Sequence, residues 1–258
     1  MFGSSASKLE RSAPAPALIP PNVTRFHRRM IYLRHLLKKA FIIRRDYRLC
    51  ILGEESTGCA WTLCPDHLGP KSVVYSGGVG RDISFEHALT KQFGCQVVLF
   101  DPSPIGQATM ELPENKNPQF RFLPVGLAGQ CGPLRLAPPF TSEGDSWFSH
   151  AGPSGTIEVR CLDLATAMEE NQHRHVDLLK IDIEGAEYGV IDHILGKRIP
   201  VRQILVEFHD GILPGVRLTQ SLSAIFRLLG RGYKLVSEVG NNHTFIWGRD
   251  WPQKPHAQ

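Results

Sequence analysis

Short apolar runs alternate with amphipathic stretches along most of the chain beyond residue 72. Apolar runs of strand character cover 72–76, 96–100, 120–127, 176–183 and 201–208, and helical periodicity covers 82–93, 103–112, 164–170, 186–195 and 218–231. Near-continuous apolar strands separated by helices are typical of a parallel sheet covered on both faces. Two last runs, 233–239 and 243–248, predict a closing hairpin. We therefore expect an α/β fold with a mostly parallel sheet, helices on both faces and a C-terminal antiparallel hairpin.

Two irregular stretches interrupt this alternation. Residues 53–68 precede the first strand, and residues 128–155, rich in Gly and Pro, follow the third, before an extended run at 156–162. Each irregular stretch carries a tryptophan, Trp61 or Trp147, among hydroxyl-bearing side chains. Such loops suit the recognition of a polyhydroxylated acceptor, although loops of this composition also occur as plain surface with a docked tryptophan.

The N-terminal part of the chain differs in composition from the rest. Residues 1–22 are rich in Ser, Ala and Pro and are expected to be disordered. Residues 23–48 form a basic amphipathic segment with helical periodicity. This segment either docks on the domain or contacts a membrane surface, a nucleic acid or an acidic partner. The domain itself is expected to span 49–250, followed by a short tail at 251–258.

Charge and cysteine content narrow the class of protein. The chain carries a net charge of +4, and residues 25–48 hold nine Lys/Arg and one acid, 9 − 1 = +8, so the remainder carries 4 − 8 = −4. A domain with an acidic balance is a poor match for nucleic acid, which we do not expect as a partner. The six cysteines show no CxxC pair or zinc-ligand spacing, and no apolar run reaches 18 residues. We expect reduced thiols and a cytoplasmic protein.

A glycine-rich turn, "SGGVGRD", follows the first strand of the predicted sheet. In a doubly wound sheet, ligands bind beyond the carboxyl ends of the strands, and this turn lies at such an end. Gly77, Gly78 and Gly80 permit positive φ and let a ligand approach the backbone closely, although tight packing alone also produces such turns. The dinucleotide fingerprint G-x-G-x-x-G fails because Ile83 occupies its last position, and no P-loop sequence is present.

Two acids near this turn narrow the choice of ligand. Asp101 ends the second strand, where a carboxylate can accept hydrogen bonds from ribose hydroxyls. Asp82 follows the turn and would repel a pyrophosphate, whereas it tolerates a ligand with an ammonium group. The glycine turn, the ribose acid and the lack of a phosphate-binding sequence together favour S-adenosylmethionine as the cofactor.

The stretches "VYSGGVGRDISFEHALTKQFGCQVVLFDPSP", "VDLLKIDIEGAEYGVIDHIL" and "ILVEFHDGILPG" resemble the FkbM-type family of S-adenosylmethionine-dependent methyltransferases. The resemblance runs from residue 53 to residue 247, and "KIDIEGAE" is its most specific part. It implies a Rossmann-like class I methyltransferase fold with a seven-stranded sheet, and methyl transfer commonly to an oxygen of a sugar or natural product. It also implies that the three glycines form the cofactor turn and that Asp101 binds the ribose. Ser76 stands where many class I methyltransferases have an acid, and Asp82 is the candidate to take over that contact, so we count both among the cofactor-binding residues.

Acidic and imidazole side chains follow two strands at the centre of the predicted sheet. Asp182 and Glu184 end one strand on the same side, and Glu207 and His209 share a face at the end of the other. Carboxylates there could bind acceptor hydroxyls or act as base, and His209 has the pKa range that suits removal of a hydroxyl proton. Asp182, His209 and Glu184 are therefore our catalytic candidates. The alternatives are that Glu184 serves the helix start, that Asp182 organises the loop and that His209 is structural. The four residues could also hold a divalent cation such as Mg²⁺, but no spacing here is diagnostic of a metal.

We predict an S-adenosylmethionine-dependent O-methyltransferase that acts on a sugar or another small hydroxylated acceptor. The alternative is a non-catalytic binding module with a methyltransferase-like fold, in which the basic N-terminal segment makes the interactions. The failed dinucleotide fingerprint argues against an NAD or sugar-nucleotide enzyme.

Overall fold

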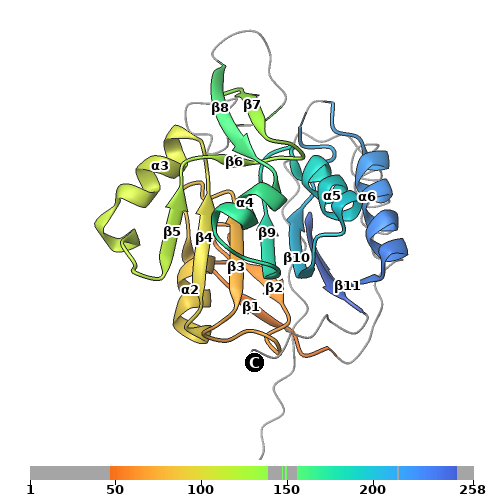
Figure 1. The fold of residues 1–258 in the computed structure, drawn as a ribbon, viewed down its shortest axis with the longest axis horizontal. Helices are drawn as coiled ribbons and strands as arrows, with labels where there is room; N and C mark the ends of the chain where they lie inside the picture. Colours follow the sequence, from red (N-terminus) through yellow and green to blue (C-terminus); the bar gives the residue numbers. More distant parts are fainter. Residues whose placement is uncertain (1–46, 139–146, 148, 150–155, 214, 249–258) are drawn as a thin grey trace, which may run out of the picture.

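The computed structural model describes residues 47–138, 147, 149, 156–213 and 215–248. A seven-stranded sheet forms its centre, in the order β11-β12-β10-β9-β3-β4-β5 (Figure 1). The strands are β3 (Val73–Gly77), β4 (Gln96–Phe100), β5 (Phe120–Leu123), β9 (Val176–Ile181), β10 (Val201–Glu207), β11 (Tyr233–Val239) and β12 (Asn242–Trp247). Neighbours from β5 to β10 pair in parallel, whereas β12 runs antiparallel to both β10 and β11. The predicted α/β fold with a mostly parallel sheet is confirmed.

Five α-helices of the described chain pack around this sheet. They are α2 (Ser84–Phe93), α3 (Pro104–Glu111), α4 (Leu164–Glu170), α5 (Glu187–Lys197) and α6 (Leu218–Arg231), and a 3₁₀ turn follows α3 at Pro113–Asn115. Successive strand residues face opposite sides of the sheet. Tyr75 therefore belongs to the apolar cluster that includes residues of α4, α5 and α6, and its neighbour Val74 belongs to the cluster that includes residues of α2 and α3. Because both faces of the sheet are buried, the central strands are nearly continuous apolar runs in the sequence.

A short hairpin packs on the same face of the main sheet as α2. Its strands are β1 (Cys50–Leu52) and β2 (Trp61–Leu63), which pair antiparallel. The side chain of Gln203 in β10 holds the backbone of Cys64, accepting from its N–H at 2.7 Å and donating to its carbonyl at 3.1 Å. Trp61 is buried and belongs to the apolar cluster that includes residues of α2 and α3. The stretch 53–68, predicted to be loop throughout, therefore contributes a strand to the core.

A second sheet of three strands, β6-β8-β7, lies at the top of Figure 1. It consists of β6 (Gly126–Leu127), β7 (Gly132–Leu136) and β8 (Ile157–Leu162). The predicted strand 120–127 is thus divided between two sheets, because Pro124 lacks a backbone N–H for the ladder and the chain leaves the main sheet there. The predicted loop 128–155 contains β7, whose side chains alternate between partly buried and exposed positions.

Several predictions about the ends of the chain lie outside the described residues. These are the disordered tail 1–22, residues 23–46 of the basic segment, and the tail 251–258. Within the described ranges, the structure contains no helix with the length and apolar character needed to cross a bilayer. All six cysteines are free thiols in the structure.

Candidate functional site

A large cavity opens where β3, β4, β9 and β10 end, which is the edge at which a doubly wound sheet binds its ligand. Its volume is about 1120 Å³, slightly above the range of about 300–1,000 Å³ that is typical of small-molecule sites. The glycine turn lines one wall, acidic residues after β9 and β10 line another, and Leu134 and Leu136 of the three-stranded sheet add apolar surface. The partly exposed side chains of Leu112 and Ile212 also border it. The cavity therefore has room for a cofactor and an acceptor together.

The glycines of the turn serve different physical purposes. Gly78 has a φ of +90°, and a Cβ atom there would lie 1.9 Å from the carbonyl oxygen of Asp182. A Cβ atom on Gly77 would lie 3.1 Å from Ile183 Cγ2. Gly80 has a φ of +56°, and a Cβ atom there would meet nothing within 4 Å. The bare backbone at Gly78 is thus required by the segment after β9, whereas Gly80 borders open space in the cavity wall.

Asp101, the predicted ribose acid, organises the glycine turn from the end of β4. Its Oδ2 atom accepts the backbone N–H groups of Val79 at 2.9 Å and Gly80 at 3.0 Å. Its Oδ1 atom accepts the backbone N–H of Ser103 at 2.8 Å. Asp101 also lines the cavity, so its binding to ribose stays a prediction that the geometry permits.

The structure places the other two predicted cofactor residues in different surroundings. Ser76 is fully buried and donates its hydroxyl hydrogen to Glu86 Oε1 at 2.5 Å, and it is not one of the described residues that line the cavity. Asp82 does line the cavity, and it accepts hydrogen bonds from the backbone N–H of Ser84 at 2.6 Å and from the hydroxyl of Thr57. Burial disfavours the charged form of Asp82, but these hydrogen bonds outweigh it and lower its pKa. Of the two, only Asp82 offers a charge to a ligand.

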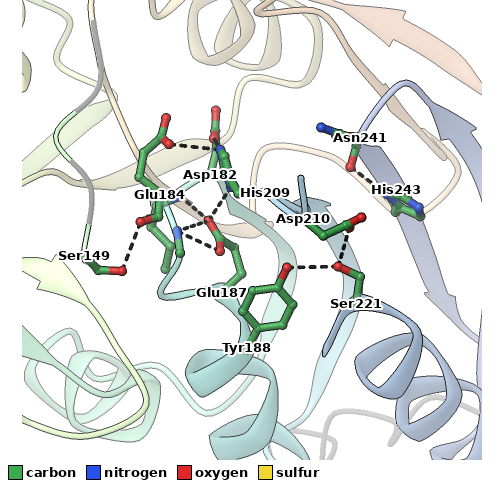
Figure 2. Close-up of polar contacts among 12 residues, drawn as sticks. Ser149, Asp182, Glu184, Glu187, Tyr188, His209, Asp210, Ser221, Asn241 and His243 are labelled. Atoms are coloured by element: carbon green, nitrogen blue, oxygen red, sulfur yellow. Dashed lines mark hydrogen bonds and ion pairs between the residues drawn. The ribbon is translucent and has the colours of Figure 1, made fainter. Parts of the chain in front are cut away.

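Acidic side chains surround the imidazole of His209 beyond the ends of β9 and β10 (Figure 2). His209 is buried, and its Nε2 atom lies 3.2 Å from Glu184 Oε2 and 3.7 Å from Asp182 Oδ1. Its Nδ1 atom lies 3.0 Å from Glu187 Oε1. Burial alone would lower the pKa of His209, but the two glutamates outweigh burial and raise the pKa to about 12. His209 is therefore a cation held between two carboxylates.

The local backbone fixes this arrangement. Glu184 has a φ of +52°, a strained value for a residue with a side chain, and its carbonyl accepts both the N–H and the hydroxyl of Ser149. Glu187 is fully buried, and its carboxylate accepts the backbone N–H groups of Ile183 and Gly185. Glu187 thus serves the start of α5, the role that the sequence left open for Glu184, and Glu184 faces the imidazole.

The proton-accepting role predicted for His209 does not suit these contacts, because a protonated imidazole has no site for a further proton. Glu207 lines the same cavity, and burial together with the charge of Asp182 raises its pKa. Burial also raises the pKa of Asp182. Two neighbouring carboxyl groups of this kind titrate as a unit and can hold a proton near neutral pH. The pair Asp182–Glu207 is therefore the part of the site that can take up or release one.

Three of these residues could also form the divalent-cation site that the sequence suggested as a possibility. Asp182, Glu207 and His209 offer ligand atoms that lie within 4.8 Å of one another. A histidine that ligates a metal must be neutral, however, and Glu184 and Glu187 stabilise the protonated form here. A divalent cation such as Mg²⁺ would have to displace this proton, so it stays an alternative to the imidazolium.

Sequence reasoning missed a buried ion pair beneath the glycine turn. Lys180 lies in the otherwise apolar strand "VDLLKIDI", and that isolated charge was the available signal. Its Nζ atom donates to the carbonyl of Gly78 at 2.7 Å and lies 3.7 Å from Glu86 Oε1. Both side chains are buried, but only Lys180 is among the described residues that line the cavity.

The two tryptophans predicted to shape a substrate pocket take different places. Trp147 lines the cavity. Trp61 is buried in the core, with its ring centroid 5.5 Å from Lys180 Nζ, and is not among the described lining residues. The segment before the first strand contributes Thr57, Gly58 and Cys59 to the wall instead.

Comparison with known proteins gives one family and distant structural likenesses. The family model described as the methyltransferase FkbM domain matches residues 76–235. No curated protein sequence matches the chain. Among solved structures, a methyltransferase from Pyrococcus furiosus is similar at 12% identity and a TM-score of 0.36, over 86% of this chain and 98% of that chain. The fibrillarin pre-rRNA processing protein of Methanococcus jannaschii is similar at 11% identity and a TM-score of 0.37, over 80% and 86%.

Proposed function

Because the chain belongs to the FkbM methyltransferase family, we propose that it is an S-adenosylmethionine-dependent O-methyltransferase whose acceptor is a sugar or another small hydroxylated molecule. The observation that carries this proposal is a shared cavity. The glycine turn with Asp101 and the carboxyl pair Asp182–Glu207 line the same space. Methyl transfer requires a cofactor and an acceptor to be held next to each other, and this cavity brings the two sets of residues together.

The wall beside β3 and β4 has the properties that a nucleoside needs. Gly80 leaves open space where its side chain would be. A carboxylate has about four lone-pair sites, and Asp101 uses three of them on backbone N–H groups, which leaves one for a ribose hydroxyl. Asp82 adds a second negative charge in the wall, which favours a cationic ligand. When bound, S-adenosylmethionine supplies an electrophilic methyl group.

Proton transfer from the acceptor falls to the carboxyl pair in this proposal. A hydroxyl oxygen gains nucleophilic character as its proton moves to a base within hydrogen-bond reach. Burial and the charge of Asp182 raise the pKa of Glu207 to about 8, so a fraction of the protein carries its unprotonated carboxylate near neutral pH, and that form lines the cavity as the base. His209 remains protonated and holds Glu184 in place, so its contribution is a fixed positive charge next to the pair.

The test combines cofactor binding with methyl transfer. Isothermal titration should show micromolar binding of S-adenosylmethionine and no binding of NAD. Incubation with methyl-labelled cofactor and a panel of sugars and other hydroxylated molecules should then label at least one acceptor. Glu207→Gln should lower kcat by about 10²–10⁴ while cofactor affinity stays the same, because only the proton acceptor is lost. Glu111→Gln, an exposed acid in α3, is the matched control and should behave as the wild type.

The outcomes separate the proposal from its alternative. Binding of S-adenosylmethionine without transfer to any acceptor, in a protein that is folded, would favour the non-catalytic binding module. Full turnover by Glu207→Gln with an identified acceptor would remove Glu207 as the base. Absence of cofactor binding would overturn the proposal as a whole.

A further inference from the structure

Lys180 is a buried charge in the cavity wall, and the proton transfer and ribose binding described above do not use it. It lies in β9, the strand next to β3, and is 5% exposed. Burial disfavours its charge, but Glu86 and other nearby carboxylates outweigh burial and raise its pKa, so it is an ammonium ion. A buried charge on the wall of a cavity, rather than deep in the core, is positioned to meet a ligand of opposite charge.

The hydrogen bonds of Lys180 leave part of its capacity unused. An ammonium group has three N–H donors, and one of them is given to the carbonyl of Gly78 at 2.7 Å. Glu86 lies at 3.7 Å, which is an ion pair but is longer than a hydrogen bond. The indole ring of Trp61 lies at 5.5 Å and offers its face rather than an acceptor oxygen. At least one N–H is therefore available for an acceptor that enters the cavity.

The surroundings of Lys180 match one end of the proposed cofactor. Asp182 lies two positions further along the same chain segment and lines the same cavity, so a positive and a negative side chain stand next to each other. An α-amino acid carries a carboxylate and an ammonium group on one carbon and is complementary to such a pair. Asp101, which suits the ribose, lies beyond β4, two strands away from β9 at about 4.8 Å per strand. The nucleoside and amino-acid ends of one ligand can thus reach separate sets of residues.

We propose that Lys180 binds the α-carboxylate of the methionine end of S-adenosylmethionine, with Asp182 facing the ammonium group of the same end. This inference rests on the proposed function, because it requires S-adenosylmethionine to be the cofactor. It accounts for a lysine in the middle of an apolar strand. It also gives Glu86 and Ser76 a shared purpose, since Glu86 holds Lys180 by charge and Ser76 holds Glu86 by a hydrogen bond.

The experiment compares two ligands that differ only in the carboxylate. Isothermal titration measures S-adenosylmethionine and decarboxylated S-adenosylmethionine against the wild type and against Lys180→Met. The wild type should prefer the complete cofactor by about 10- to 150-fold, the range of one charge-assisted hydrogen bond. In Lys180→Met this preference should vanish, because the affinity for the complete cofactor falls while the affinity for the decarboxylated ligand stays within about twofold of the wild type. Lys91→Met, an exposed lysine near the end of α2, is the matched control and should keep the full preference.

Two results would overturn the inference while the proposed function stands. The first is a wild type that binds both ligands equally well, a measurement that remains decisive if Lys180→Met fails to fold. The second is a folded Lys180→Met that loses affinity for both ligands to the same extent, which would make Lys180 a support for the turn alone. If the wild type binds neither ligand, the inference and the proposed cofactor both fail.

Discussion

Replacement of Asp101 by alanine tests how far the cofactor wall depends on one carboxylate. Asp101 is 6% exposed and accepts backbone N–H groups from Val79, Gly80 and Ser103 at 2.9, 3.0 and 2.8 Å. Alanine removes the acceptor of all three at once. It also leaves a gap against α3, because a Cβ atom on Gly106 would come within 2.2 Å of Asp101 Cγ, so the two are in close contact.

The size of the effect follows from these three hydrogen bonds. A buried N–H without an acceptor costs about 1–3 kcal/mol. Both Val79 and Gly80 line the cavity, but Gly80 is only partly buried, so water can replace part of the loss there, whereas Val79 is buried. We therefore expect Asp101→Ala to lower the free energy of unfolding by about 2–4 kcal/mol, which corresponds to a fall in Tm of roughly 4–16 °C for a chain of this size. Asp101→Asn keeps a carbonyl oxygen and should lose about half as much.

Urea denaturation followed by circular dichroism measures the stability of each variant, and titration with S-adenosylhomocysteine measures its cofactor affinity below its Tm. Glu55→Ala removes an exposed acid before β2 and is the control, with an expected change within about 0.5 kcal/mol. A loss of less than about 0.5 kcal/mol in Asp101→Ala would refute the reasoning, because it would show that the carboxylate does not organise the turn. Full affinity for the ligand in a folded Asp101→Asn would separately exclude a charge-assisted ribose contact.

Two further predictions concern other parts of the fold. Gly78→Ala should yield little folded protein, because Gly78 has a φ of +90° and the new Cβ atom would lie 1.9 Å from a carbonyl oxygen. Gly80 has a φ of +56° with open space around it, so a thermal melt of Gly80→Ala should show a free energy of unfolding lowered by only about 1 kcal/mol. Asp163→Ala should cost about 1 kcal/mol at pH 7, because Asp163 accepts a backbone N–H as the N-cap of α4. Hydrogen bonds and the nearby His193 lower the pKa of Asp163 despite its burial, so this stabilisation is complete above its unfolded pKa of about 4 and is lost as the pH falls through the lower folded value. A difference between the two proteins that stays constant from pH 7 to pH 2 in urea melts would contradict that assignment.

The order of strands and helices could be predicted from the sequence because each element carries its own periodicity. The strand 176–183 and the helix 186–195 are examples, since the first is a short, nearly continuous apolar run and the second has helical spacing of its apolar residues. The small sheet β6-β8-β7 could not be predicted in the same way. Its strands β6 and β7 have two and five residues, and Pro133 stands within the second. Pairing partners distant in the chain, rather than local pattern, hold these residues in strands.

The candidate site was only partly predictable for a related reason. Residues that directly follow a parallel strand lie at the ligand-binding edge of the sheet. The sequence positions of Asp182, Asp101 and His209 were therefore enough to place them at that edge. Protonation depends on what packs against a side chain from other elements. The carboxylate of Glu187 comes from α5, and no spacing in the sequence shows that it reaches the second nitrogen of His209. Contacts between elements decide such roles, and they appear only in three dimensions.

The position of Trp61 beneath Lys180 gives this protein a built-in optical reporter. Trp61 is 2% exposed and its ring centroid lies 5.5 Å from Lys180 Nζ, so the ammonium charge rather than solvent sets the energy of its excited state. A ligand that neutralises the ammonium alters the electric field at the ring. Entry of an anion into this part of the cavity should therefore shift the tryptophan emission of the unlabelled protein. Replacement of Trp61 by phenylalanine should remove the part of the shift that Trp61 contributes, and Trp147, which lines the cavity, accounts for what remains.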